Sequence, residues 1–216
     1  MIGLLRKDLY VLKSQKLFVT QLIFVVIALV IGYEEPILGV FAGTILASTL
    51  SITTIAYDDY NNSSTFLFTL PISRKTYVVS KYLFSLLFCV AVSMVVSLII
   101  FFWHFSLLTA GGLGTWLLQV LIVTLAPMLF ASLMIPINLK FGTERGRIVM
   151  VVLFVAVGIL SPFASDLIQS ARAQSFLLFI SRQDTWMLLL LFVAVISLVA
   201  LFSVVISVHV MRKKEF

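Results

Sequence analysis

The longest stretch without a charged residue runs from Tyr82 to Leu139 and contains 58 residues. A soluble domain carries roughly a quarter of its residues as Asp, Glu, Lys or Arg, because its surface must face water. Only 11% of this chain is charged, and 62% is hydrophobic. About 20 apolar residues cross a bilayer as one helix. The stretch is therefore too apolar for a soluble surface and too long for one membrane span.

Charge-free windows predict six membrane spans. Gly111, Gly112 and Gly114 interrupt the long stretch and separate the third span from the fourth. The expected spans are residues 17–33, 36–57, 82–104, 113–139, 148–165 and 185–211. Each is expected to be a helix, because a segment inside lipid must satisfy its own backbone hydrogen bonds. The predicted fold class is an all-α integral membrane protein, with residues 1–216 forming a single transmembrane domain.

Lys and Arg residues predict the orientation of these spans. Cytoplasmic segments of membrane proteins carry an excess of Lys and Arg. If the N-terminus is cytoplasmic, 13 of the 15 basic residues fall in inner segments, and only Arg172 and Arg182 fall outside. An odd number of spans would break this alternation, so both termini are expected in the cytoplasm. The short basic clusters between apolar runs favour contact with lipid headgroups and argue against nucleic acid as a partner.

Two apolar segments lie outside the spans. Residues 1–15 are expected to form an amphipathic helix on the inner membrane surface, because apolar residues recur there at helical spacing. These residues are Ile2, Leu5, Leu9 and Leu12. A solvated basic leader is the alternative. Residues 175–180 are apolar but too short to cross, which predicts a re-entrant outer segment or, equally, an ordinary capping loop.

The sequence lacks the motifs that many membrane enzymes and ATPases require. It has no His-Glu-x-x-His zinc motif, no Gly-x-Ser-x-Gly elbow and no Walker A loop. The centres of the expected spans hold no ionisable residue of the kind that ion-coupled carriers use. We therefore expect no catalytic residue, no metal site and no cofactor bound by this chain. The single cysteine, Cys89, excludes an intrachain disulfide.

Polar and small residues inside the spans suggest packing and transport surfaces. A face of small residues on the second span permits close helix packing, either within the chain or between subunits. It consists of Gly39, Gly43, Ala47 and Ser51. Uncharged polar groups and a helix-kinking proline could line a substrate path, or could simply be satisfied within their own helices. These candidates are Ser48, Thr53, Gln119, Thr124 and Pro127.

The first inner loop carries the most varied sequence. Asn61–Ser64 offers helix N-caps, and residues 65–70 could form one or two apolar helical turns. Such a short helix in the cytosol indicates a docking element for a partner, or an interfacial helix that contacts only lipid. The candidate docking residues are Asp58, Asp59, Tyr60, Phe66, Leu67, Phe68 and Leu70.

Three short motifs resemble those of small ABC-2 type transporter permeases. They are Leu70-Pro-Ile-Ser-Arg-Lys75 followed by Ser80-Lys-Tyr-Leu83, Pro136-Ile-Asn-Leu-Lys-Phe-Gly-Thr-Glu-Arg-Gly-Arg147, and Leu4-Leu-Arg-Lys-Asp-Leu-Tyr10. The first is the most specific, and its hallmark residues are Pro71, Ser73, Arg74 and Lys75. The loop departs from the family at residues 61–64, where Asn-Asn-Ser-Ser stands in place of the expected charge.

The resemblance implies a bacterial cell-membrane permease subunit of an ATP-binding cassette exporter. Two such subunits, identical or homologous, would pair with two copies of a separate ATPase subunit, which would bind ATP and Mg²⁺. The first inner loop would be the coupling helix that docks on the ATPase. The cargo would be an amphipathic peptide, an antibiotic or a lipid-like molecule. The alternatives are an immunity or sensor protein for membrane-active peptides, and a carrier that needs no ATPase.

Overall fold

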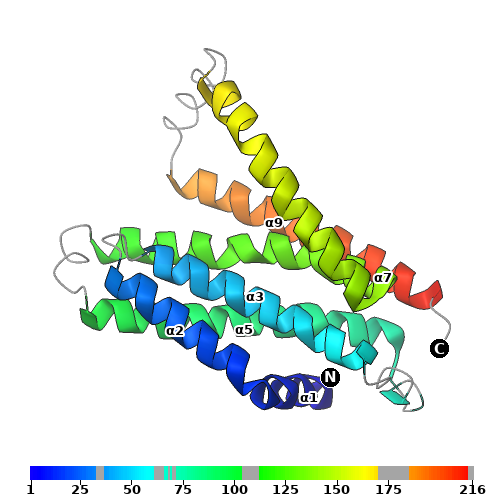
Figure 1. The fold of residues 1–216 in the computed structure, drawn as a ribbon. Coiled ribbons are helices and arrows are strands. Elements are labelled where there is room, and N and C mark those ends of the chain that lie inside the picture. Colours follow the sequence, from blue (N-terminus) through cyan, green and yellow to red (C-terminus); the bar gives the residue numbers. More distant parts are fainter. Residues whose placement is uncertain are drawn as a thin grey trace.

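The computed structural model describes residues 1–32, 37–60, 66, 67, 69, 72–103, 112–169 and 185–213. Within these ranges 97% of the residues are helical and there is no strand, in agreement with the all-α prediction. The labelled helices are α1 (Ile2–Ser14), α2 (Lys16–Gly32), α3 (Ile37–Tyr60), α5 (Arg74–Trp103), α7 (Leu113–Gln169) and α9 (Thr185–Lys213). Both chain termini lie at the same end of the bundle, called the terminal end below (Figure 1).

Four helical segments of the described chain are long and apolar enough to cross a membrane. They are Ile37–Tyr60, Arg74–Phe102, Gly114–Gly142 and Trp186–Lys213. These segments correspond closely to four of the six expected spans. The expected first span falls on α2, which has 17 residues, and the expected fifth span falls on the second half of α7. The proposed re-entrant segment, 175–180, lies outside the described residues.

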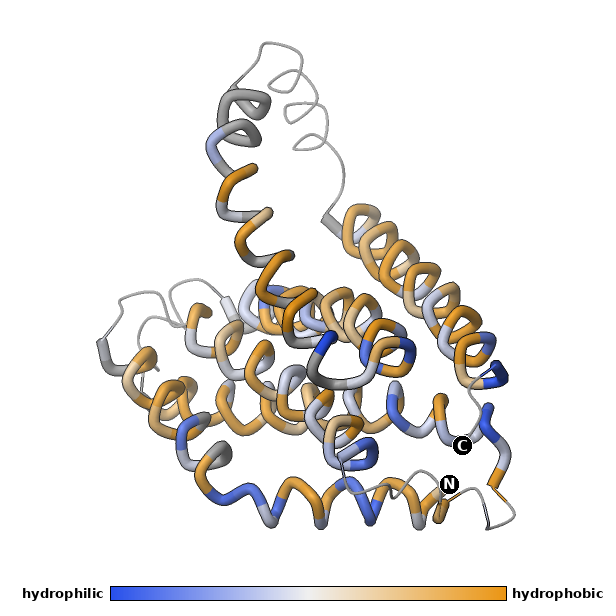
Figure 2. Tube along the Cα trace, turned by 45° about the vertical axis from the view of Figure 1, so that its right-hand side comes forward, coloured by the Kyte–Doolittle hydropathy of each residue, from blue (hydrophilic) through white to orange (hydrophobic). Residues whose placement is uncertain are grey.

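Hydropathy distinguishes the terminal end from the rest of the bundle. Figure 2 shows hydrophobic residues along the middle of the long helices and hydrophilic residues gathered near both termini. The most apolar window of α9 has a mean hydropathy of 3.1, and only 11% of it is buried. Apolar side chains that remain exposed on a long helix are typical of a surface that faces lipid.

Gly142 divides α7 into two helices. Its φ of 76° and ψ of 177° lie in a region of conformational space that is essentially restricted to glycine. A Cβ atom at this position would also lie 3.0 Å from the Asp59 carboxylate at the end of α3. The expected fourth and fifth spans leave residues 140–147 between them, and in the structure the helix breaks at one residue of this interval. The second half of α7 then leans away from α3 (Figure 1).

Helix α3 is central, because it packs against α1, α2, α5 and α7. Its face of small residues, which is entirely buried, meets neighbouring helices of the same chain. A Cβ atom on Gly39 would lie 2.8 Å from Val30 of α2, and one on Gly43 would lie 3.3 Å from Val96 of α5. Of the two interpretations left open by the sequence, this arrangement corresponds to packing within the chain.

Replacing Gly39 with leucine is expected to destabilise the bundle by about 2–3 kcal/mol, because overpacking forces neighbouring side chains and backbone apart. Unfolding can be followed by heating the purified protein with a fluorogenic maleimide, since the single cysteine, Cys89, is buried. The matched control is Gly114→Leu, where a Cβ atom meets nothing within 4 Å. Equal unfolding temperatures for the two variants would contradict the close approach of α2 and α3.

Candidate functional site

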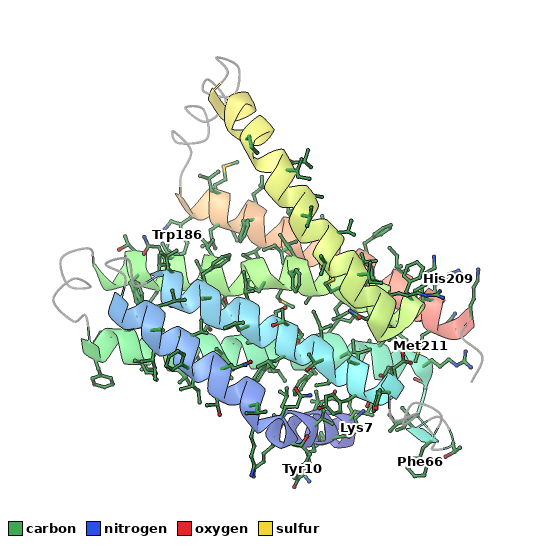
Figure 3. All side chains as sticks on the ribbon, viewed as in Figure 1. Lys7, Tyr10, Phe66, Trp186, His209 and Met211 are labelled. Atoms are coloured by element: carbon green, nitrogen blue, oxygen red, sulfur yellow. The ribbon has the colours of Figure 1, made fainter. Side chains whose placement is uncertain are left out.

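The α3–α5 loop (residues 61–73) starts and ends at the terminal end of the bundle. Tyr60, the last residue of α3, is 86% exposed, and Phe66 is 67% exposed. Figure 3 shows Phe66 pointing away from the helices. Among the other candidate docking residues, Phe68 and Leu70 lie outside the described part of the chain, as do Asn61–Ser64 and Pro71. The loop therefore presents an exposed aromatic residue beyond the end of the bundle.

Leu67 has the opposite environment from its neighbour Phe66. It is buried in the apolar cluster that also contains Leu4 of α1, Ile55 of α3 and Tyr77 of α5. Residues 66, 67 and 69 are helical. Consecutive residues of a helix point in different directions, so this short piece anchors one side chain in the core and projects the other outward.

The hallmark residues at the start of α5 have local structural roles. The Ser73 hydroxyl accepts a hydrogen bond from the Thr76 backbone N–H at 3.1 Å, which makes it a cap for the N-terminus of α5. The Arg74 guanidinium donates to the carbonyl oxygens of Met211 at 2.9 Å and Arg212 at 2.7 Å. These carbonyls belong to the last turn of α9, where no intrahelical donor is available. Lys75 is exposed.

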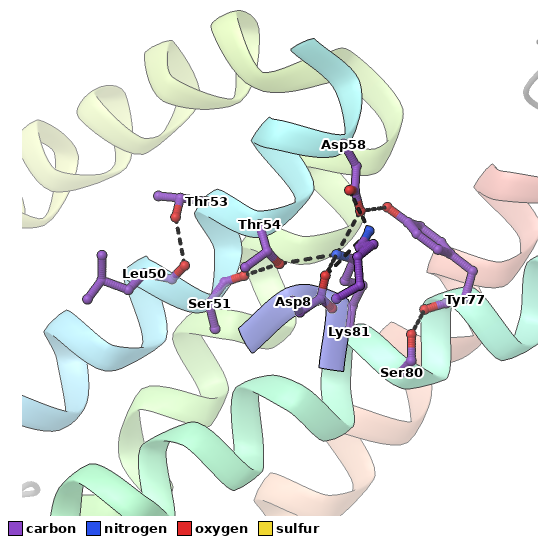
Figure 4. A network of polar contacts seen from close by, with 10 residues as sticks. Asp8, Leu50, Ser51, Thr53, Thr54, Asp58, Tyr77, Ser80 and Lys81 are labelled. Carbon is purple, nitrogen blue, oxygen red and sulfur yellow. Dashed lines mark hydrogen bonds and ion pairs between the residues drawn. The ribbon is translucent and has the colours of Figure 1, made fainter. Parts of the chain in front are cut away.

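A cluster of four charged side chains lies beside the α3–α5 loop. Lys7 and Asp8 come from α1, Asp58 from α3 and Lys81 from α5; this set is called the ion cluster. The Lys81 Nζ atom lies 2.7 Å from Asp8 Oδ1 and 2.8 Å from Asp58 Oδ2. Lys7 donates to the other Asp58 oxygen, Oδ1. Figure 4 shows Asp8, Asp58 and Lys81 converging between the three helices.

Two neutral side chains add hydrogen bonds to the ion cluster. The Tyr77 hydroxyl donates to Asp58 Oδ2 at 2.9 Å, and Lys81 donates to the Thr54 hydroxyl at 3.2 Å. Lys81 thus has three acceptors for its three N–H donors. The second oxygen of Asp8, Oδ2, has no hydrogen-bond partner within the described part of the chain.

Burial makes these pairings necessary. The side chains of Asp8, Asp58 and Lys81 are 0%, 4% and 2% exposed, and that of Lys7 is 26% exposed. A buried charge is tolerated only where an opposite charge and hydrogen bonds compensate for its lost hydration. Two positive and two negative groups make the ion cluster neutral overall. It connects α1 to the last turn of α3 before the loop and to the first turns of α5 after it.

The ion cluster gives Asp58 a structural role inside the protein. The sequence grouped Asp58 with Asp59 and Tyr60 as a docking residue, but Asp58 faces the interior and binds three groups of its own chain. Asp59 is partly buried beside Gly142. Sequence reasoning also missed Asp8, although it lies at the i+4 position between Leu4 and Leu12 on one face of α1. The signal in the sequence was the position of the Asp8 carboxylate on the same helix face as two leucines.

The residues suggested for a substrate path lie on α3 and α7, and their polar groups bind mainly to backbone carbonyls. The Ser48 hydroxyl donates to the Pro127 carbonyl at 3.3 Å in the buried contact between α3 and α7. Thr53 and Thr124 donate to carbonyls of their own helices, whereas Gln119 is exposed. The structure therefore brings Ser48 and Pro127 together across the contact between α3 and α7.

Residues 3–212 match the model of a family described as ABC-2 family transporter protein. The chain belongs to this family. Searches of curated proteins and of solved structures gave no match. As a member of the ABC-2 family, the chain is a multi-pass membrane permease of an ABC transporter. ABC-2 permeases are generally non-enzymatic membrane components, and membership implies association with an ATP-binding cassette component.

Proposed function

We propose that this ABC-2 permease receives its energy from a separate ATPase that docks on the α3–α5 loop. The observation that carries the proposal is the exposure of Phe66 on a segment whose neighbour Leu67 is anchored in the core. Aromatic side chains that are exposed on the free protein are typical anchors of protein interfaces. Tyr60, also exposed, lies at the start of the same loop.

The architecture proposed with this function has six spans, with the terminal end in the cytoplasm. Helix α2 and the second half of α7 would be the two further spans. The distribution of Lys and Arg supports this orientation, since 13 of 15 would lie on the cytoplasmic side. Two permease subunits, identical or homologous, would pair with two ATPase copies, and ATP and Mg²⁺ would bind to the ATPases.

The proposed cargo is an amphipathic peptide, an antibiotic or a lipid-like molecule, and the proposed direction is export. The absence of charged residues from Tyr82 to Leu139 supports a largely apolar path. An apolar groove of about 310 Å³ between α2 and α5, lined by residues such as Ile23, Ile27 and Val95, also supports cargo with an apolar part.

Purification from native membranes tests the proposed partnership. A tagged copy of the chain, extracted in mild detergent, is expected to retain a protein that carries a Walker A motif, identified by mass spectrometry. The complex should hydrolyse ATP, and the isolated permease should not. A stable permease that moves its cargo across vesicles without an ATPase would contradict the proposal and favour an ATP-independent carrier. A stable permease that purifies alone and moves no cargo would favour an immunity or sensor protein.

A further inference from the structure

Two of the four charges in the ion cluster belong to α1, which precedes the expected spans. Asp8 is fully buried and lies 2.7 Å from Lys81, while Lys7 binds Asp58. A partner that docks on the α3–α5 loop needs neither the Asp8–Lys81 pair nor the Lys7–Asp58 pair for its own binding. Figure 3 shows Lys7 on the side of α1 that faces the bundle, whereas Tyr10 points away from it. The buried charges of α1 therefore connect this helix to both ends of the loop.

Helix α1 packs on the bundle through two buried leucines as well, Leu4 in the cluster with Ile55 and Leu12 in a cluster with Leu50 and Phe84. Its inward stripe consists of Leu4, Asp8 and Leu12, while Ile2 and Leu9 are 70% and 54% exposed. If α1 moved away from α3 and α5, Asp8 would lose Lys81, and Asp58 would lose Lys7. Separation of buried ion pairs leaves charges without compensation. The ion cluster thus favours movement of α1 together with the ends of α3 and α5.

Helix α1 is joined to α2 through a single residue. Gln15 lies between Ser14, the end of α1, and Lys16, the start of α2. Its backbone N–H donates to the Leu12 carbonyl at 2.9 Å, and its side chain is buried. Because a one-residue link restricts the relative motion of two helices, a displacement of α1 also displaces the start of α2.

We infer that Lys7 and Asp8 are positioning residues through which displacement of the α3–α5 loop is transmitted to α1 and then to α2. The inference rests on the proposed docking of an ATPase at this loop. According to this inference, displacement of the loop reaches the first expected span, which falls on α2, through the side chains of Lys7 and Asp8 and not through the loop alone.

The double substitution Lys7→Gln with Asp8→Asn isolates this role. It removes one positive and one negative charge, so the cluster remains neutral. It leaves the Lys81–Asp58 pair at 2.8 Å and the Tyr77–Asp58 hydrogen bond at 2.9 Å in place. The matched control is Arg6→Gln with Lys13→Gln, because both residues are on the exposed side of α1. Maleimide reaction of Cys89 on heating verifies that each variant is folded.

Hydrogen–deuterium exchange of the permease–ATPase complex provides the readout. In the wild type, Mg-ATP with vanadate is expected to change exchange both in the loop peptides and in peptides covering residues 2–17. In the double variant the loop response should persist, while the response of residues 2–17 falls to about a tenth. The Arg6/Lys13 control should behave as the wild type. Lys7→Arg with Asp8→Glu, which keeps both charges, should restore most of the response.

The outcomes separate this inference from the function on which it rests. An unchanged response of residues 2–17 in the double variant would overturn the inference, as would a wild-type complex in which only the loop responds. If the wild-type loop itself does not respond to nucleotide, or no ATPase is retained, the proposed function fails first.

Discussion

Replacement of Lys81 with methionine is expected to destabilise the folded protein strongly and to lower its unfolding temperature. The substitution leaves Asp8 and Asp58, both buried, with Lys7 as the remaining cation of the cluster. Removal of one partner from a buried ion pair costs about 3–5 kcal/mol, because the other charge stays buried without compensation. Such a loss is a large share of the stability of a typical protein. The measurement is the unfolding temperature obtained from the reaction of Cys89 with a maleimide.

A second substitution should reverse much of this loss. Adding Asp8→Asn to Lys81→Met removes the unpaired carboxylate and leaves Lys7 with Asp58, so the cluster is neutral again. The double variant is therefore expected to be more stable than Lys81→Met alone, although it differs from the wild type at one more position. Residues in one ionic network are expected to show such non-additivity. If the two effects simply add, Asp8 and Lys81 are not paired.

Phe66→Glu is expected to weaken ATPase binding about 30-fold, which corresponds to a loss of ~2 kcal/mol. The substitution places a charge where the proposed interface needs an apolar anchor. Phe66 is 67% exposed and, within the described part of the chain, lies outside the buried apolar cluster that holds Leu67, so the permease itself should fold normally. The amount of ATPase retained during purification gives the binding loss, and the unfolding temperature gives the stability.

The matched variant at this position is Phe66→Leu, which keeps an apolar side chain. It should retain most of the ATPase, because leucine can still fill an apolar pocket on the partner. If the Glu and Leu variants retain equal amounts of ATPase, the ATPase docks elsewhere. If both variants lose folded protein equally, Phe66 stabilises the core of the permease.

The absence of charge located four of the expected spans on helices that are long and apolar enough to cross a membrane, but two of these helices extend beyond the charge-free windows. The sequence ended the second span at Tyr57 and began the third at Tyr82, because Asp58 and Lys81 carry charge. In the structure α3 continues to Tyr60, and α5 starts at Arg74. The two charges neutralise each other across the helices. A window along the chain does not contain that information, since the partners are distant in sequence.

The loop and α1 illustrate a second limit of sequence reasoning. The sequence identified residues 65–70 as a short apolar helical piece, but not which side chains face the core. That choice depends on how α1, α3 and α5 pack, and it separates Leu67 from Phe66. Similarly, the apolar spacing in α1 predicted a helix, whereas Asp8 acquires its role only when Lys81 lies opposite.

The most direct test of the account is photo-crosslinking from position 66. A photoreactive phenylalanine analogue at Phe66, in membranes that contain the intact transporter, is expected to crosslink to the ATP-binding cassette subunit. The same analogue at Leu133, which is 55% exposed on the apolar first half of α7, should not. Crosslinks from position 66 to lipid alone, with the ATPase captured elsewhere or not at all, would contradict docking at the α3–α5 loop.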